Sequence, residues 1–154
     1  MSLEFNKKTG EFEDSKKSFM VCAGVEMVGS KAFVESQFLK RGYVKKNTGD
    51  LIGTFAGIPN ARISLEERDG DVRRIRINIK PANTELFEDL YSALCKKYCK
   101  TPEIREDKTS SHASFFLSNG SIFIYYYESD IRLIYEGTSD LYRNKRINNM
   151  MGDI

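Results

Sequence analysis

The chain has 154 residues, which suits one domain with a buried core of its own. Hydrophobic residues make up 40% and charged residues 30% of it, and this mixture excludes a disordered or fibrous chain. The formal net charge of +2 is too small to argue for a nucleic-acid partner.

The N-terminal stretch, residues 1–18, is polar and predicts a flexible arm or a weak hairpin that turns near Gly10. It carries charge without an apolar run, and residues 19–29 are interrupted by Glu26 and too short to cross a bilayer. We therefore expect neither a signal peptide nor a membrane helix. Residues 19–154 predict a single α+β domain.

Residues 19–81 form the first predicted unit of this domain. It begins with a strand at 19–25, and a helix follows that Ser30 caps and that ends near Gly42, where a left-handed residue is wanted. The dipeptide Asp69-Gly70 is typical of a hairpin turn, because both residues tolerate positive φ. The strands predicted after the helix are 43–46, 51–55, 61–66 and 72–79.

Residues 82–137 form the second predicted unit. Pro81 ends the preceding strand, and Asn83 or Thr84 caps a helix whose apolar side chains recur at i, i+4 and i+8 on one face. A polar loop at 100–111 separates this helix from a meander of strands. We expect these strands at 114–117, 122–128 and 131–136.

The last segment, residues 138–154, places Ile147, Met150, Met151 and Ile154 at helical spacing. We expect this C-terminal helical segment to close one edge or end of the sheet.

The fold class follows from the order of these elements. A helix-then-strands unit cannot bury its own apolar faces, so two such units are expected to share their strands. The predicted fold is α+β, with a single antiparallel twisted sheet and the helices packed on one face. We expect one core to contain Ile75, Ile77, Ile79, Leu90, Leu94, Ile131 and Leu133.

Short motifs carry a resemblance to known proteins: KRGY at 40–43, GTFAG at 53–57, and Tyr98 with Pro102 beyond it. Through them the region 19–136 resembles a family of small uncharacterised bacterial proteins, in which a helix ending in Gly plus an aromatic residue precedes a Gly-x-Phe-Ala-Gly strand. The tandem helix-plus-strands plan also resembles the β-lactamase-inhibitor-protein-like fold. That second resemblance implies a protein that binds other proteins or acts in envelope assembly, whereas the family of uncharacterised proteins brings no known chemistry.

Cysteine and histidine are the candidates for metal or thiol chemistry. Cys95 and Cys99 share one face of the second predicted helix and His112 follows in the expected loop, but a structural zinc site needs four ligands and a nucleophile needs a base beside it. We therefore interpret the cysteines as packing residues and His112 as a solvated loop residue, and we expect no enzyme activity, metal or cofactor. The odd cysteine count, completed by Cys22, fits a reducing compartment, so we expect a cytoplasmic protein.

The candidate binding residues come from strand alternation. In the strand at 72–79 isoleucines alternate with cations, which places the isoleucines in the core and the cations on the outer sheet face. In the run 122–127 two aromatic-rich rows alternate, and the pattern leaves open which row faces solvent. Exposed aromatics beside arginines are typical of protein-binding surfaces. The candidate binding residues are Arg62, Arg74, Arg76, Phe123, Tyr125, Tyr127 and Arg132.

From these residues we expect a non-enzymatic binding or protein-interaction domain that uses the outer sheet face. One alternative is a nucleic-acid-binding module, for which the same residues supply a stacking platform with cations but without an RNP-type motif. Another is a small-ligand-binding or enzymatic domain with a pocket between helix and sheet. A face that is merely solvated is the third. The sequence names no partner and no oligomeric state.

Overall fold

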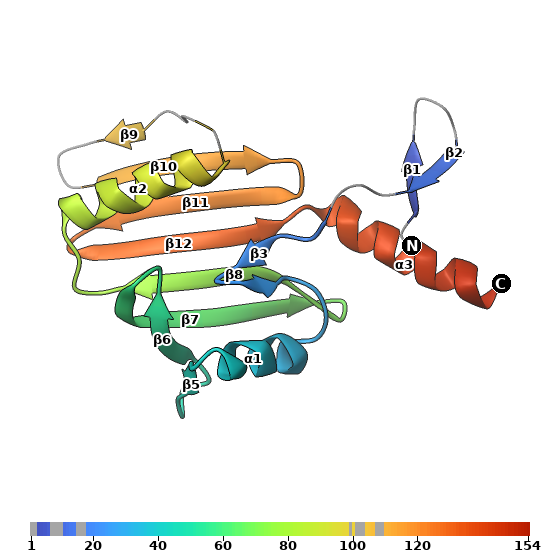
Figure 1. Cartoon of the computed structure of the whole chain (residues 1–154), viewed down its shortest axis with the longest axis horizontal. Coiled ribbons are helices and arrows are strands. Elements are labelled where there is room, and N and C mark those ends of the chain that lie inside the picture. The colour runs from blue at the N-terminus through green and yellow to red at the C-terminus, as the bar shows by residue number, and fades with distance from the viewer. Residues whose placement is uncertain (1–2, 7–10, 15–17, 99, 101–103, 107–109) are drawn as a thin grey trace.

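The computed structural model describes residues 3–6, 11–14, 18–98, 100, 104–106 and 110–154. Its main feature is an eight-stranded antiparallel sheet, in the order β5-β6-β7-β8-β12-β11-β10-β9 (Figure 1). The predicted α+β class with an antiparallel sheet is therefore confirmed. In sheet order the strands are β5 (Val44–Lys45), β6 (Leu51–Phe55), β7 (Ile58–Arg68), β8 (Asp71–Ile79), β12 (Asp130–Gly137), β11 (Gly120–Tyr127), β10 (Ser110–Leu117) and β9 (Ile104–Glu106).

The expected single sheet is wrong, because two short ribbons stand outside the eight-stranded one. Strand β3 (Val21–Cys22) pairs with β4 (Val25–Glu26), where the sequence predicts one continuous strand at 19–25. The chain folds back at Ala23 and Gly24, whose φ angles are 53° and 78°. Alanine is not a typical turn residue, so the sequence pattern does not predict this bend.

The second ribbon lies near the N-terminus. Strand β1 (Leu3–Asn6) pairs antiparallel with β2 (Glu11–Asp14). The expected turn at Gly10 falls outside the described residues. Figure 1 shows this ribbon beside helix α3 (Ser139–Asp153), which β1 contacts.

Side-chain caps begin the first two helices, as the sequence predicts. Helix α1 (Lys31–Lys40) follows Ser30, whose hydroxyl accepts a hydrogen bond at 3.1 Å from the backbone N–H three residues on. Helix α2 (Thr84–Tyr98) follows Asn83, whose side-chain oxygen accepts one at 2.8 Å in the same pattern. Gly42 has the left-handed φ, 92°, that the exit of α1 requires.

One hydrophobic core joins α1 and α2 to the inner face of the eight-stranded sheet. Inward residues stand opposite each other on neighbouring strands, as Leu133 of β12 does with Ile77 of β8. The predicted core is confirmed, since all its members are buried in one cluster. The helices contribute Val34, Phe38, Phe87, Leu90 and Leu94 to that cluster.

The polar stretch at 100–111 is not the loop that its composition predicts. Where the structure describes it, the stretch holds β9 and the start of β10, and these two strands pair at one edge of the sheet. Serine and histidine are compatible with a strand here because alternate positions of an antiparallel sheet can face water.

Helix α3 leaves the sheet instead of closing an edge of it (Figure 1). The edge strands are β5 and β9, whereas α3 follows the central strand β12. Its first half is anchored to the domain, because the buried Tyr142 hydroxyl donates to the Met27 carbonyl at 2.9 Å and Lys145 pairs with Asp71. Strand β1 contacts the helix as well. Its far end is exposed, with Met150 at 57%. The predicted C-terminal helix is therefore present, but it does not cover either edge strand of the eight-stranded sheet.

Candidate functional site

The structure places all seven predicted binding residues on the sheet face opposite the core, which we call the outer face. Residues directly opposite each other in an antiparallel ladder share a face. Tyr125 stands opposite Arg132, Arg132 stands opposite Asn78, and Asn78 stands opposite Arg62. Phe123 stands opposite Ile134, which stands opposite Arg76. Tyr127 stands opposite Asp130. Arg74 stands between Glu66 and Glu136 on its two neighbouring strands.

Aromatic side chains cover the β10–β11 half of the outer face. Its aromatic row consists of Phe123, Tyr125 and Tyr127, since Ile122 and Ile124 of the alternate row are buried. Tyr125 is 39% and Tyr127 is 52% exposed, and Phe116 of β10 reaches 66%. These rings form an exposed aromatic surface on β10 and β11.

Ring contacts fix the orientation of this surface. The His112 ring stacks on Tyr125 at a centroid distance of 5.9 Å, and Phe116 meets Phe123 edge-on at 6.2 Å. His112 is therefore part of strand β10 and not the solvated loop residue that the sequence predicts. Aromatic pairs of this kind stabilise a geometry beyond the area that they bury.

The other half of the outer face carries ion pairs and a hollow of about 230 Å³. Arg62, Arg76 and Arg132 line this arginine hollow, together with Asp50 as the one carboxylate among its described lining residues. Arg62 lies 3.6 Å from Asp50, and Arg132 lies 3.3 Å from Asp130. Arg76 reaches Glu66 only at 4.0 Å, and its side chain is 57% exposed. Among the described lining residues, three arginines thus meet one carboxylate, and Asp130 and Glu66 pair with two of the arginines from outside the lining.

Arg74 differs from the other three predicted arginines. Its guanidinium lies 3.5 Å from Glu66 and 3.3 Å from Glu136, and its side chain is only 33% exposed. Two carboxylates already compensate its charge, so Arg74 ties three strands together and offers little to a partner.

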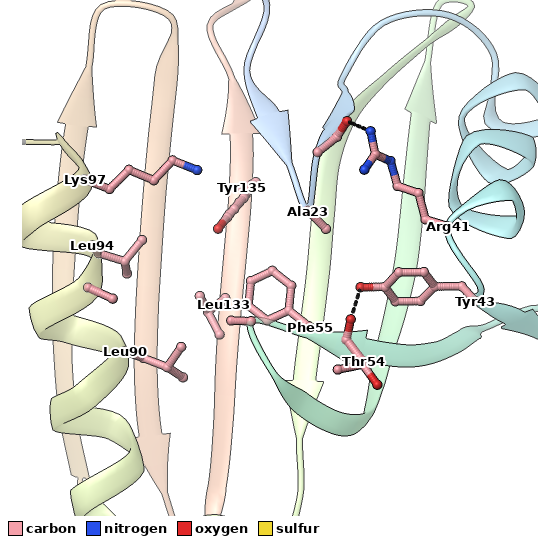
Figure 2. Close-up of a pocket in the computed structure, with 13 residues that line it drawn as sticks. Ala23, Arg41, Tyr43, Thr54, Phe55, Leu90, Leu94, Lys97, Leu133 and Tyr135 are labelled. Carbon is pink, nitrogen blue, oxygen red and sulfur yellow. Dashed lines mark hydrogen bonds between the residues drawn. The ribbon is translucent and has the colours of Figure 1, made fainter.

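A second candidate site, the inner pocket, lies on the core side of the sheet between α2, β12 and the β3–β4 turn (Figure 2). Its volume is about 450 Å³. Leu90 and Leu94 of α2, Leu133 of β12 and Phe55 of β6 supply its apolar walls. No sequence prediction named these residues as a site, although a pocket between helix and sheet was one of the expected alternatives.

Hydrogen bonds hold the wall of the inner pocket that faces α1. Arg41 donates to the Gly24 carbonyl at 2.7 Å, and the Tyr43 hydroxyl donates to the Thr54 carbonyl at 2.9 Å (Figure 2). A Cβ at Gly53 would collide with the Tyr43 ring, so glycine is needed for that ring to lie on β6. The aromatic ring of Tyr43, after α1, and the first glycine of GTFAG therefore depend on each other in this chain.

Lys97, Arg41 and the phenol of Tyr135 give the inner pocket its polar side. Figure 2 shows Lys97 extending from α2 in the direction of Tyr135, with Arg41 across the pocket. Burial raises the pKa of Tyr135 well above its ordinary value, and the nearby Cys22 and Tyr98 raise it further. Its hydroxyl is therefore protonated at neutral pH and able to donate. Asp and Glu do not occur among the described lining residues.

No protein family, curated protein or solved structure matches the chain. The two sites described above therefore carry the functional inference by themselves.

The described cysteines line neither the inner pocket nor the arginine hollow, whereas His112 belongs to the outer face. Cys22 is fully buried, and burial raises the pKa of its thiol, which Lys97 only partly offsets. Cys95 is a free, half-buried thiol, and Cys99 lies outside the described residues. In the described part of the chain, no three His, Cys, Asp or Glu side chains gather where they could hold a metal ion. None of the described helices is long and apolar enough to cross a membrane.

Proposed function

We propose that this protein binds another protein through the outer face of its eight-stranded sheet. The observation that carries the proposal is the exposed aromatic row of β11, which lies directly beside the arginine hollow. Single exposed apolar residues are ordinary, but a contiguous row next to arginines has the composition of interface cores.

The aromatic half supplies contact area at a low entropic cost. Tyr125 is stacked on His112 and Phe123 is held by Phe116, so these rings lose little freedom when a partner covers them. Rigid tyrosines that are already oriented are the residues that dominate binding energy in many interfaces. We therefore place the energetic centre of the interface at Tyr125.

The arginine hollow indicates the chemistry of the partner. Arg76 is half-exposed and only loosely paired, and one strand, β12, separates it from the aromatic row of β11. A carboxylate entering the hollow would meet the donors of three arginines, for which bidentate pairing is favourable. The partner we propose is a folded protein that presents an acidic side chain flanked by apolar residues.

A nucleic-acid partner fits the same surface less well. Phosphate binding depends on uncompensated cations, and the arginines of this face are accompanied by Asp50, Glu66, Asp130 and Glu136. The resemblance to the β-lactamase-inhibitor-protein-like fold points in the same direction as our proposal. The odd cysteine count keeps the cytoplasm as the proposed location.

The test compares capture by three forms of the purified protein in extract of its native host. The first is the parent, and the second carries Tyr125→Ala with Arg76→Ala on the outer face. The third, a matched control, carries Phe33→Ala with Lys40→Ala, which removes an exposed aromatic residue and an exposed cation of α1 away from that face. Partners are identified by mass spectrometry and then purified for titration.

We expect the parent and the α1 control to capture the same protein, and the outer-face variant to bind it at least ~30-fold more weakly, as befits loss of a hot spot. Equal capture by all three forms would contradict the proposal and leave the face merely solvated. Capture that nuclease treatment abolishes would instead identify nucleic acid as the partner.

A further inference from the structure

The inner pocket separates charge from apolar surface. In Figure 2 Lys97, Tyr135 and Arg41 lie toward the end marked by Ala23, whereas Leu90, Leu133 and Phe55 lie toward the other end. All six residues line the same cavity of about 450 Å³. This volume falls within the range of small-molecule sites, roughly 300–1,000 Å³.

The polar end has donors and positive charge without described acceptors to match. Lys97 makes a cation–π contact with Tyr98 at 5.6 Å, but no described carboxylate forms an ion pair with it. Arg41 uses one nitrogen on the Gly24 carbonyl and keeps its charge uncompensated by the described lining. The Tyr135 hydroxyl has no hydrogen bond to another described residue. A bound anion would offer acceptors to the Lys97 ammonium and the Tyr135 hydroxyl, with the positive charge of Arg41 across the pocket.

We propose that the inner pocket binds a small organic carboxylate with an apolar body. The carboxylate lies at the Lys97 and Tyr135 end, and the apolar body lies against Leu90, Leu94 and Leu133. A planar carboxylate has two acceptor oxygens, so it can meet the ammonium and the phenol at once. This site is independent of the proposed protein-binding face, which lies on the opposite side of the sheet.

The bound body is apolar and compact, because the walls that receive it carry aliphatic and phenyl side chains. Phe55 and Leu133 are buried, while Ala93 and Lys97 of α2 are exposed at the rim. The rim position of Ala93 offers a way to close the pocket without touching its cations. A short aliphatic chain with one terminal carboxylate is the simplest probe that combines an apolar body with the proposed head group.

The experiment titrates the purified full chain with octanoate, octanol and octylammonium by isothermal calorimetry at pH 7. The three probes share one tail and differ only in the head group. We expect octanoate to bind at least about tenfold more tightly than octanol, with octylammonium the weakest, because a hydrogen bond to a charged group favours the anion by that factor or more.

Variants assign the effect to the pocket. Lys97→Gln keeps the stem and removes the charge, and it should weaken octanoate binding about tenfold or more while leaving octanol unchanged. Tyr135→Phe should weaken it roughly fivefold. Ala93→Trp should abolish binding of all three probes, since a bulky side chain at this exposed helical position fills the rim. Lys40→Gln, which removes a cation next to Arg41 but outside the lining, should bind like the parent.

Three results would overturn this proposal: no binding of octanoate, equal binding of octanoate and octanol, or an unchanged octanoate affinity in both Lys97→Gln and Ala93→Trp. The outer-face variant with Tyr125→Ala and Arg76→Ala should bind octanoate like the parent. Its loss of partner protein and its retained octanoate affinity would then separate the two sites.

Discussion

The two faces of the eight-stranded sheet are built from the same strands but differ in how their side chains are used. On the inner face, β8 and β12 pair isoleucine with isoleucine and leucine, and these residues are almost completely buried. On the outer face, the same strands carry Arg76 opposite Ile134, and Arg76 remains exposed. Alternation along each strand thus separates the residues that pack the core from those that face outward, where we propose that a partner binds.

This difference teaches where substitutions should matter. An inner residue contributes through close packing, so its loss leaves a cavity. An outer residue adds exposed area and charge, which contribute little to the stability of the chain by itself. The inner pocket is the exception, since it places polar groups inside the packed face.

The largest expected effect is on the inner face. Leu90→Ala removes a large buried side chain of α2 and should lower the free energy of unfolding by about 2–5 kcal/mol. Urea unfolding followed by circular dichroism measures it. Leu39→Ala, at a 44% exposed position of α1, is the control and should change little. A midpoint for Leu90→Ala equal to that of the parent would mean that α2 does not pack on the sheet.

The next effect is a loss of stability at alkaline pH. Cys22 has an ordinary pKa of 9.0, and its burial raises the pKa of the folded protein's thiol. Below pH 9 both states hold the proton, whereas above it the unfolded chain ionises first, so the free energy of unfolding falls by about 1.4 kcal/mol per pH unit. Tyr135 and Tyr142, whose pKa burial also raises, add to this fall above pH 10.

The measurement is urea unfolding of the parent and of Cys22→Ala between pH 7 and 10 with a reductant present. Cys22→Ala removes the titrating thiol, so its stability should stay level until the tyrosines begin to ionise. Parallel pH profiles for the two proteins would show that the Cys22 thiol is not protected by the fold.

The smallest expected effect on the free energy of unfolding is on the outer face. Tyr125→Ala and Arg76→Ala, alone or together, should each change the free energy of unfolding by no more than about 0.5 kcal/mol, because both side chains project into water. Their expected consequence lies in partner binding. A loss of several kcal/mol would show that the outer face supports the fold and is not reserved for recognition.

Much of the fold can be predicted because local signals agree with it. The Ser30 cap, the Asp69-Gly70 turn and the isoleucine alternation of β8 each reflect short-range chemistry, and each is confirmed. The bend at Ala23 and the strand β9 could not be foreseen. Ala23 adopts a positive φ that its side chain does not favour, and β9 is a short edge strand in polar sequence.

The candidate site could be predicted in part for the same reason. Alternation placed the arginines and one aromatic row outward, but it could not show that Arg74 is compensated by two carboxylates of neighbouring strands. His112 could have been found from the alternation of residues 110–117, in which Ala113 and Phe115 face inward. The inner pocket could not be found, since α2, β12 and the β3–β4 turn meet only through the tertiary fold.

The direction of α3 has a practical consequence for attaching labels to this protein. The helix carries the chain away from the sheet, and Ile154 at its end is fully exposed (Figure 1). A fluorophore or a surface tether joined there is separated from both the outer face and the inner pocket by most of the length of a helix of 15 residues, about 1.5 Å per residue. Immobilisation through this end leaves both proposed binding sites open to solution.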